Sequence, residues 1–169
     1  ANIQVRDSHV LLIQREQERL WEDFNWPHLR IYPTIELQAG QYLYSLPDNL
    51  TMDRVETIEV YDGGRWEPLR PEITDRDYET YETALDQRAW PVEAWRTDEN
   101  DDVEVWPIPS QNAVTATLEG TLRVTGIRNL NTFVADGDVA DLDGRLLVLY
   151  VAAGILAAAG ANDAQLKFE

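Results

Sequence analysis

The feature that most constrains this chain is a nearly continuous apolar segment close to its end, residues 146–161. Its sixteen residues include no charged side chain. Such a composition predicts an α-helix that is apolar on every side, which must be covered by the chain's own fold, by other subunits or by lipid. At 1.5 Å per residue the helix is about 24 Å long, shorter than the roughly 30 Å hydrocarbon core of a bilayer. We therefore expect protein, and no membrane, to cover it.

Two sources of protein cover remain open for this helix. The first is another helix of the same chain, predicted over residues 8–24 from apolar side chains at helical spacing. These side chains are Val10, Ile13, Leu20, Trp21 and Phe24, with Gln17 between them. Because one amphipathic helix covers only one side of an apolar partner, the second source is burial shared with neighbouring subunits.

The balance of charges narrows the possible partners. The 169 residues include 31 acidic and 14 basic side chains, which gives a formal net charge of −17. Such a surface repels nucleic-acid phosphates, so specific DNA binding is not expected. The chain contains no cysteine, which excludes disulfides, thiolate catalysis and cysteine metal sites. The hydrophobic fraction of 44% indicates a folded protein in spite of the charge.

The middle of the chain alternates with the period of β-strands. Strands are predicted at residues 29–38, 42–46, 55–61, 66–69, 92–96, 103–108 and 115–125. The first two are expected to pair as a hairpin, and Pro33 indicates an edge strand or a bulge in the first. A tight turn at Gly63 and Gly64 is expected to join the third and fourth strands.

Further local signals refine this outline. In the last strand, Leu118, Leu122 and Val124 are expected to point inward. Thr74 with Asp77 three residues later resembles a capping box, which predicts a short surface helix over 75–85.

Helix-terminus signals stand at both ends of the chain. Asp7 or Ser8 is expected to cap the first helix, and Pro27 follows its end. The apolar helix is expected to begin near Leu142, after an acidic segment favoured by the helix dipole. At Asn162 it is expected either to stop or to run on.

Together these elements predict an α+β fold in a single domain of residues 1–169. The N-terminal helix and the C-terminal apolar helix flank an antiparallel β-sandwich or small barrel of about seven strands, with one short inserted helix. The helical part is expected to comprise residues 1–27 and 138–169, and the β part residues 28–137.

No residue pattern predicts catalysis, a cofactor or a metal site. Asp136, Asp138 and Asp141 do not follow the spacing of a calcium-binding loop, so helix capping is the preferred interpretation. The only histidines, His9 and His28, lie in no recognisable nucleophile motif. We therefore predict that the protein is not an enzyme.

The tryptophans allow two interpretations. They stand among carboxylates and prolines rather than among basic residues, which favours packing in a core or an interface over a groove for single-stranded nucleic acid. The alternative is a carbohydrate-binding β-sandwich in which exposed Trp66, Trp95 and Trp106 form a platform for a sugar.

Taken together, these segments resemble the head-tail adaptor, or head-completion, proteins in the neck of tailed bacteriophages. The resemblance covers nearly the whole chain and is carried by structural rather than catalytic motifs. The segments that carry it are residues 20–30, 39–42 with 46–47, 65–69, 105–109, 126–130 and 141–146, the last joined to the apolar helix.

The resemblance implies a homo-oligomeric ring, expected to be a dodecamer, that sits under the portal protein and joins a stopper or tail-completion protein. Double-stranded DNA would pass through the ring without specific binding, and the protein would reside in the virion neck after assembly in the bacterial cytoplasm. A tail or baseplate structural component is the nearest alternative. The subunit or portal interface is predicted to include Trp21, Phe24, Trp26, Leu146, Leu149, Tyr150, Ile155 and Leu156; residues facing DNA are not assigned.

Overall fold

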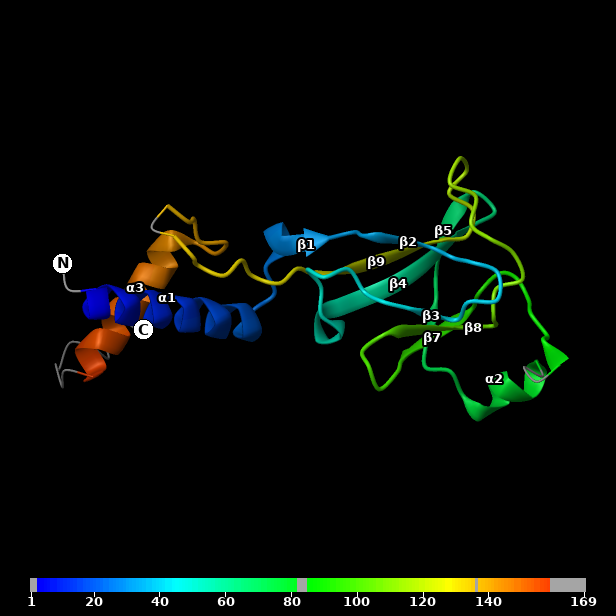
Figure 1. The fold of residues 1–169 in the computed structure, drawn as a ribbon, viewed down its shortest axis with the longest axis horizontal. Helices are drawn as coiled ribbons and strands as arrows, with labels where there is room; N and C mark the ends of the chain where they lie inside the picture. The colour runs from blue at the N-terminus through cyan, green and yellow to red at the C-terminus, as the bar shows by residue number, and fades with distance from the viewer. Residues whose placement is uncertain (1–2, 82–84, 136, 159–169) are drawn as a thin grey trace. The chain divides into compact units, whose positions relative to one another are not determined.

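The computed structural model describes residues 3–81, 85–135 and 137–158 of the chain. The chain divides into two compact units (Figure 1). The helical unit comprises Ala1–Pro27 and Leu130–Glu169, and the β unit comprises His28–Asn129. The predicted α+β class is confirmed, with three α-helices and nine strands in two sheets among the described residues. The organisation as a single domain stays a prediction.

The first sheet of the β unit is antiparallel and is built around β9. Its strands are β1 (Arg30–Ile31), β2 (Thr34–Glu36), β4 (Val55–Asp62), β5 (Arg65–Pro68) and β9 (Thr121–Ile127). Both β1 and β2 pair with one side of β9, and β4 pairs with the other side. Pro33 lies between the two edge strands, as its lack of an N–H donor predicts.

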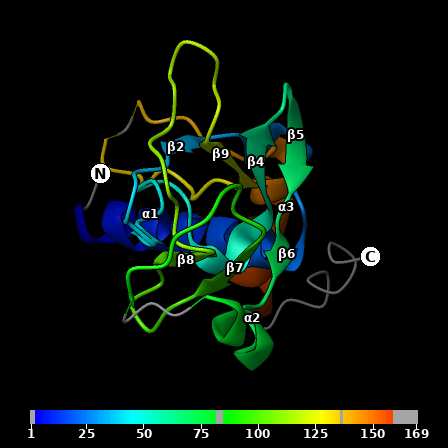
Figure 2. The ribbon, with the colours of Figure 1, turned by 90° about the vertical axis from the view of Figure 1, so that its right-hand side faces the viewer.

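The second sheet has the order β3-β8-β7-β6. Its strands are β3 (Leu43–Tyr44), β6 (Arg70–Pro71), β7 (Ala94–Thr97) and β8 (Val103–Trp106). Strand β6, which was not predicted, runs parallel to β7. Figures 1 and 2 show α2 (Asp75–Thr80) on the side of this sheet that faces away from β4.

Side chains from both sheets meet in one hydrophobic core. Its buried members are Leu37, Tyr44, Leu50, Ile58, Val60, Leu69, Val92, Val103, Val105, Leu122 and Val124. Two short 3-10 helices, Pro27–Leu29 and Met52–Arg54, precede β1 and β4. Within the described residues neither sheet closes on itself, so the predicted small barrel is wrong.

Two local predictions are confirmed in detail. Strands β4 and β5 form a hairpin whose two turn residues, Gly63 and Gly64, have φ values of 58° and 85°. Positive φ at both positions is what the primed hairpin turn requires, and glycine adopts it without steric cost. The capping box is also present, because the Asp77 carboxylate accepts the Thr74 N–H at 2.7 Å.

Helix α2 is nevertheless shorter than predicted. It ends at Thr80 rather than at residue 85, because Tyr81 has the extended φ of −132°. The side chain of Tyr81 packs against Trp106, with the ring centroids 6.2 Å apart. Contact with the second sheet therefore overrides the helical spacing.

The predicted hairpin between residues 29–38 and 42–46 is wrong. Strand β2 pairs with β9, whereas β3 pairs with β8 in the other sheet. Between them Gly40 has a φ of 80°, and its N–H donates to the Pro109 carbonyl at 2.9 Å. Alternation identifies a strand with one buried face but not the strand beside it, so the shared core decided the pairing.

The last predicted strand begins six residues late. Strand β9 starts at Thr121, and the chain before it turns at Leu118, which has a φ of 63° and is exposed. Leu118 therefore does not point inward, whereas Leu122 and Val124 are fully buried as predicted. Apolar spacing alone did not show that a turn separates Leu118 from the strand.

The helical unit contains α1 (Ile3–Asp23) and α3 (Gly144–Ala158). Helix α1 begins five residues earlier than predicted, so Asp7 and Ser8 lie inside it rather than cap it. Helix α3 begins at Gly144 rather than near Leu142, because Asp143 caps it. The Asp143 carboxylate accepts the N–H groups of Arg145 at 2.8 Å and of Leu146 at 3.1 Å. The predicted stop or continuation at residue 162 lies outside the described residues.

Candidate interaction surface

Helices α1 and α3 bury one side of each other within the helical unit. Leu20 on α1 and Leu147 and Ala153 on α3 are almost completely buried. The same-chain cover expected for the apolar helix is therefore present on this side. Burial of such side chains is the main stabilising term for a two-helix packing.

Two glutamines of α1 hold the segment that leads into α3. The Gln14 side-chain oxygen accepts the Phe133 N–H at 3.3 Å, and the Gln17 side-chain oxygen accepts the Asp141 N–H at 3.2 Å. Gln17 is fully buried, so its bond to the backbone forms in a dry environment. These bonds place Phe133 and Asp141 beside α1.

A charged cluster on α1 reaches a tyrosine of α3. Glu16 is buried on α1, and its carboxylate pairs with the guanidinium groups of Arg15 at 3.3 Å and Arg19 at 3.2 Å. The Arg19 guanidinium also lies 5.2 Å from the centre of the Tyr150 ring on α3. Glu16 therefore has cationic partners, as a buried carboxylate requires.

The acidic residues before α3 serve the backbone of their own segment. Asp141 accepts the backbone N–H of Asn131 at 2.6 Å. Asp138 accepts the N–H groups of Ala135 and Val134, and these bonds lower the pKa of its carboxyl. Because both carboxylates bind N–H donors, they hold the loop in place. Asp136 lies outside the described residues, and the described residues contain no cluster of histidine and acidic side chains suited to a metal ion.

Helix α1, helix α3 and the loop before α3 border an apolar groove with a volume of about 520 Å³, which we call the α3 groove. Among the described residues that line it, Asp138 is the one charged side chain. The lining residues are Val10, Ile13, Phe133, Val134, Ala135, Asp138, Ala140, Gly144, Leu147, Val148, Val151, Ala152 and Ile155. Helix α1, the loop before α3 and α3 itself thus each contribute one wall.

Several large apolar side chains of the helical unit face solvent. Val148 is 68% exposed and Leu149 49% exposed, and Ile155 is also exposed. In the preceding loop Val134 is 87% exposed and Val139 84% exposed. Clustered exposed apolar side chains of this kind mark contact sites rather than ordinary surface.

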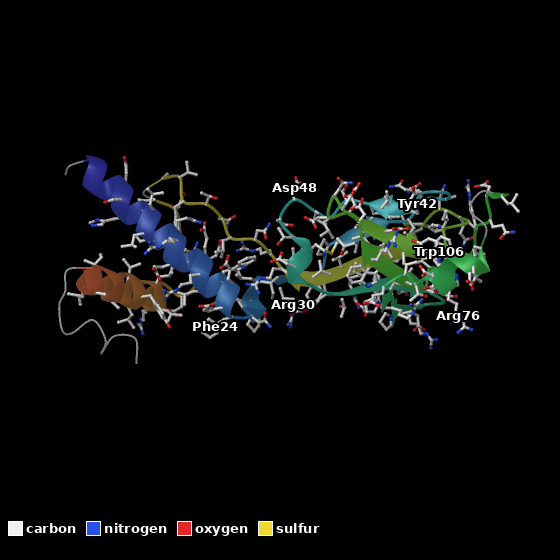
Figure 3. All side chains as sticks on the ribbon, turned by 90° about the horizontal axis from the view of Figure 1, so that it is seen from below. Phe24, Arg30, Tyr42, Asp48, Arg76 and Trp106 are labelled. Atoms are coloured by element: carbon white, nitrogen blue, oxygen red, sulfur yellow. The ribbon has the colours of Figure 1, made fainter. Side chains whose placement is uncertain are left out.

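The residues predicted for the interface all belong to the helical unit. Leu149 and Ile155 are exposed, and so is Phe24 directly after α1, which Figure 3 labels. The remaining five are half-buried: Trp21, Trp26, Leu146, Tyr150 and Leu156. Their part in a subunit or portal interface stays a prediction.

Trp26 has a clear local role at the end of α1. Its indole N–H donates to the Leu20 carbonyl at 2.9 Å, and its ring meets Phe24 edge-on with the centroids 6.2 Å apart. The sequence analysis missed Phe133, Val134 and Val139. They belong to two short apolar stretches in a loop, which carry no periodic signal.

The β unit does not present the predicted platform of three exposed tryptophans. Trp106, labelled in Figure 3, is only 4% exposed and packs against Tyr78 at a centroid distance of 4.7 Å. Trp66 is half-buried beneath the Arg123 guanidinium, which lies 4.2 Å from the ring centre. Trp95 is half-buried against the core.

A polar network fastens α2 to the second sheet instead. The buried Glu104 carboxylate accepts the Tyr78 hydroxyl at 2.9 Å and the Arg96 Nε–H at 2.6 Å. Burial, followed by the bond to Glu104, raises the pKa of Tyr78 to about 12. Both carboxylate oxygens are therefore satisfied within the protein, which is typical of a structural anchor.

No helix in the described part of the chain is both long and apolar enough to cross a bilayer. A search of curated proteins found no match. Residues 5–169 match the family model described as SU10 adaptor protein. This match confirms the resemblance to phage head-tail adaptors and extends over almost the full sequence. The chain therefore belongs to the SU10 adaptor protein family.

Proposed function

We propose that this protein is a structural component of the neck of a tailed bacteriophage. In this proposal identical subunits form a ring, expected to be a dodecamer, that joins the portal protein to a stopper or tail-completion protein. The ring surrounds a channel for double-stranded DNA. Membership of the adaptor family supports a role between other virion proteins.

The observation that carries the proposal is the exposed apolar surface of the helical unit. Helix α3 presents Val148, Leu149 and Ile155 to solvent, and two of them, Val148 and Ile155, line a groove of about 520 Å³. Water contact with this much apolar surface is unfavourable, and burial against protein removes the cost. An adaptor that is complete only in an assembly accounts for the exposure.

The net charge of −17 supports a channel that DNA does not adhere to. Like charge on the wall and on the phosphates prevents tight binding, so the polymer can slide. Assembly of the ring is expected in the host cytoplasm, followed by residence in the virion neck.

Reconstruction of the neck from electron micrographs of virions tests this proposal. The expected result is density for the β unit and the helical unit repeated around the DNA channel between portal and tail. Absence of the chain from virions would refute the proposal. Density in the tail tube or baseplate would instead support the alternative of a tail structural component.

A second experiment tests the portal contact. The purified protein is mixed with purified portal rings of the same phage and separated by size. Co-elution at a defined stoichiometry is expected, with portal rings from an unrelated phage as the control. Equal retention by both portals would show nonspecific apolar adhesion.

A further inference from the structure

The helical unit carries two apolar surfaces on different sides of α3. One is the α3 groove. The other, which we call the α3 ridge, consists of Leu149 and Leu156, and neither of them lines the groove. Seven residues separate the two leucines, so they lie on one face of the helix about 10.5 Å apart. Leu149 is exposed and Leu156 half-buried.

We infer that the α3 ridge of one copy packs into the α3 groove of a second copy. This inference rests on the proposed function, because it assigns the contact between neighbouring subunits of the ring. It commits to a second copy of this chain rather than to the portal, a tail protein or DNA.

The distribution of charge favours a second copy as the occupant. Two chains with a net charge of −17 repel each other, so they can associate closely only where few charges meet. Among the described residues of the ridge and the groove, Asp138 is the one charged side chain. Its carboxylate already accepts two backbone N–H groups. A basic partner would gain more from the acidic surface elsewhere on the chain.

The shape of the surface favours contact between unlike faces. Two grooves placed against each other would enclose unfilled space, and lining atoms would lose their packing partners. The two leucines of the α3 ridge supply apolar atoms from a separate face of the helix. Because ridge and groove are separate surfaces, each copy keeps one surface free after pairing. Repetition of such a contact generates a ring if the rotation closes.

Two lysine substitutions block the two surfaces separately. Val134→Lys places a charge on the loop wall of the groove, and Leu149→Lys places one on the ridge. Both original side chains are exposed, so we expect each variant to fold. Matched controls are Val139→Lys in the same loop and Leu11→Lys on α1, because both residues are exposed and neither lines the groove. Every variant has the same net charge, which excludes a general charge effect.

Sedimentation velocity over a range of concentrations measures self-association. We expect the wild-type chain and both controls to oligomerise. Val134→Lys and Leu149→Lys should each weaken association about a hundredfold or more, because an unpaired charge would be desolvated in the contact. An equimolar mixture of these two variants should then form dimers and nothing larger, since one retains its ridge and the other its groove.

Three results would overturn the inference. They are a wild-type chain that stays monomeric up to about 1 mM, blocking variants that assemble like the controls, and two monomeric variants that do not pair when mixed. Circular dichroism confirms that each variant is folded, and Val148→Lys replaces Val134→Lys if that variant is not. Neck density in virions combined with any of these results would leave the proposed function standing and remove only this contact.

Discussion

Replacement of Leu20 by alanine tests whether the buried face of α1 stabilises the helical unit. Leu20 is 1% exposed, and Leu20→Ala removes three carbon atoms from the interior. At about 0.8 kcal/mol for each buried methylene, the lost transfer free energy is about 2.4 kcal/mol. The residual cavity adds to this value, so we expect a loss of about 3–4 kcal/mol. The Trp26 indole bond to the Leu20 carbonyl uses the backbone and is retained.

Leu11→Ala is the matched control for this substitution, because Leu11 lies on the same helix but is 70% exposed. The same transfer calculation gives a loss of at most about 0.7 kcal/mol, which the higher helix propensity of alanine partly offsets. The assay is urea denaturation followed by circular dichroism at 222 nm, at a concentration where every variant is monomeric. Equal stabilities for Leu20→Ala and Leu11→Ala would show that Leu20 is not buried as described.

Four further predictions concern a helix cap, the dependence of stability on pH at two residues, and a buried glycine. Asp143→Ala should destabilise the helical unit by about 1 kcal/mol in thermal denaturation, because the first turn of α3 loses an acceptor for two N–H groups. Asp143→Asn keeps a side-chain oxygen and should retain most of the stability. A hydrogen bond from Arg70, with bonds from Thr74, lowers the pKa of Asp77 to about 2. The stability that the ionised Asp77 contributes should therefore be lost as the pH falls from about 4 to 2. Asp77→Asn should abolish this pH dependence in denaturation measurements. The pKa of Tyr78 is raised to about 12, which has the opposite consequence. The stability contributed by the neutral hydroxyl is complete below about pH 10 and should be lost between about pH 10 and 12. Tyr78→Phe should flatten the dependence of stability on pH in this range. Gly120→Ala should destabilise the β unit by at least about 2 kcal/mol, measured as a lower denaturation midpoint. The φ of Gly120 is 74°, and an added methyl group would overlap the Trp90 ring. An unchanged midpoint would contradict this turn geometry.

Elements specified by neighbouring residues were predictable from the sequence. The hairpin turn at Gly63 and Gly64 depends on backbone angles that glycine adopts without strain. The capping box depends on Thr74 and Asp77, which are three residues apart. Such interactions need no distant partner, so their sequence patterns are sufficient evidence for them.

Strand partners and element ends were less predictable. The chain after β2 crosses to the other sheet at Gly40, although its alternation resembles that of a hairpin. Leu118 follows the same spacing as Leu122 but lies in a turn with a positive φ. Alternation shows that one face of a segment is buried, but it does not show which distant segment provides the cover.

The candidate surface was predictable only in part. Leu149 and Ile155 followed from the apolar character of α3 and are exposed in the structure. Val134 and Val139 did not, because exposed apolar residues in a loop are common on protein surfaces. What distinguishes Val134 is its place on the wall of the α3 groove. That position depends on how the loop folds against two helices.

The sequence by itself determined that residues 146–161 need protein cover, because an uncharged helix of this length is too short for a bilayer and too apolar for water. Only the tertiary structure decided which side of the helix is covered within the chain. Gln14 and Gln17 bind backbone groups 119 and 124 residues away, and these contacts place the loop and α3 beside α1. Because packing between distant segments covers one side and leaves the groove and the ridge in solvent, the surface available to another chain is a property of the fold.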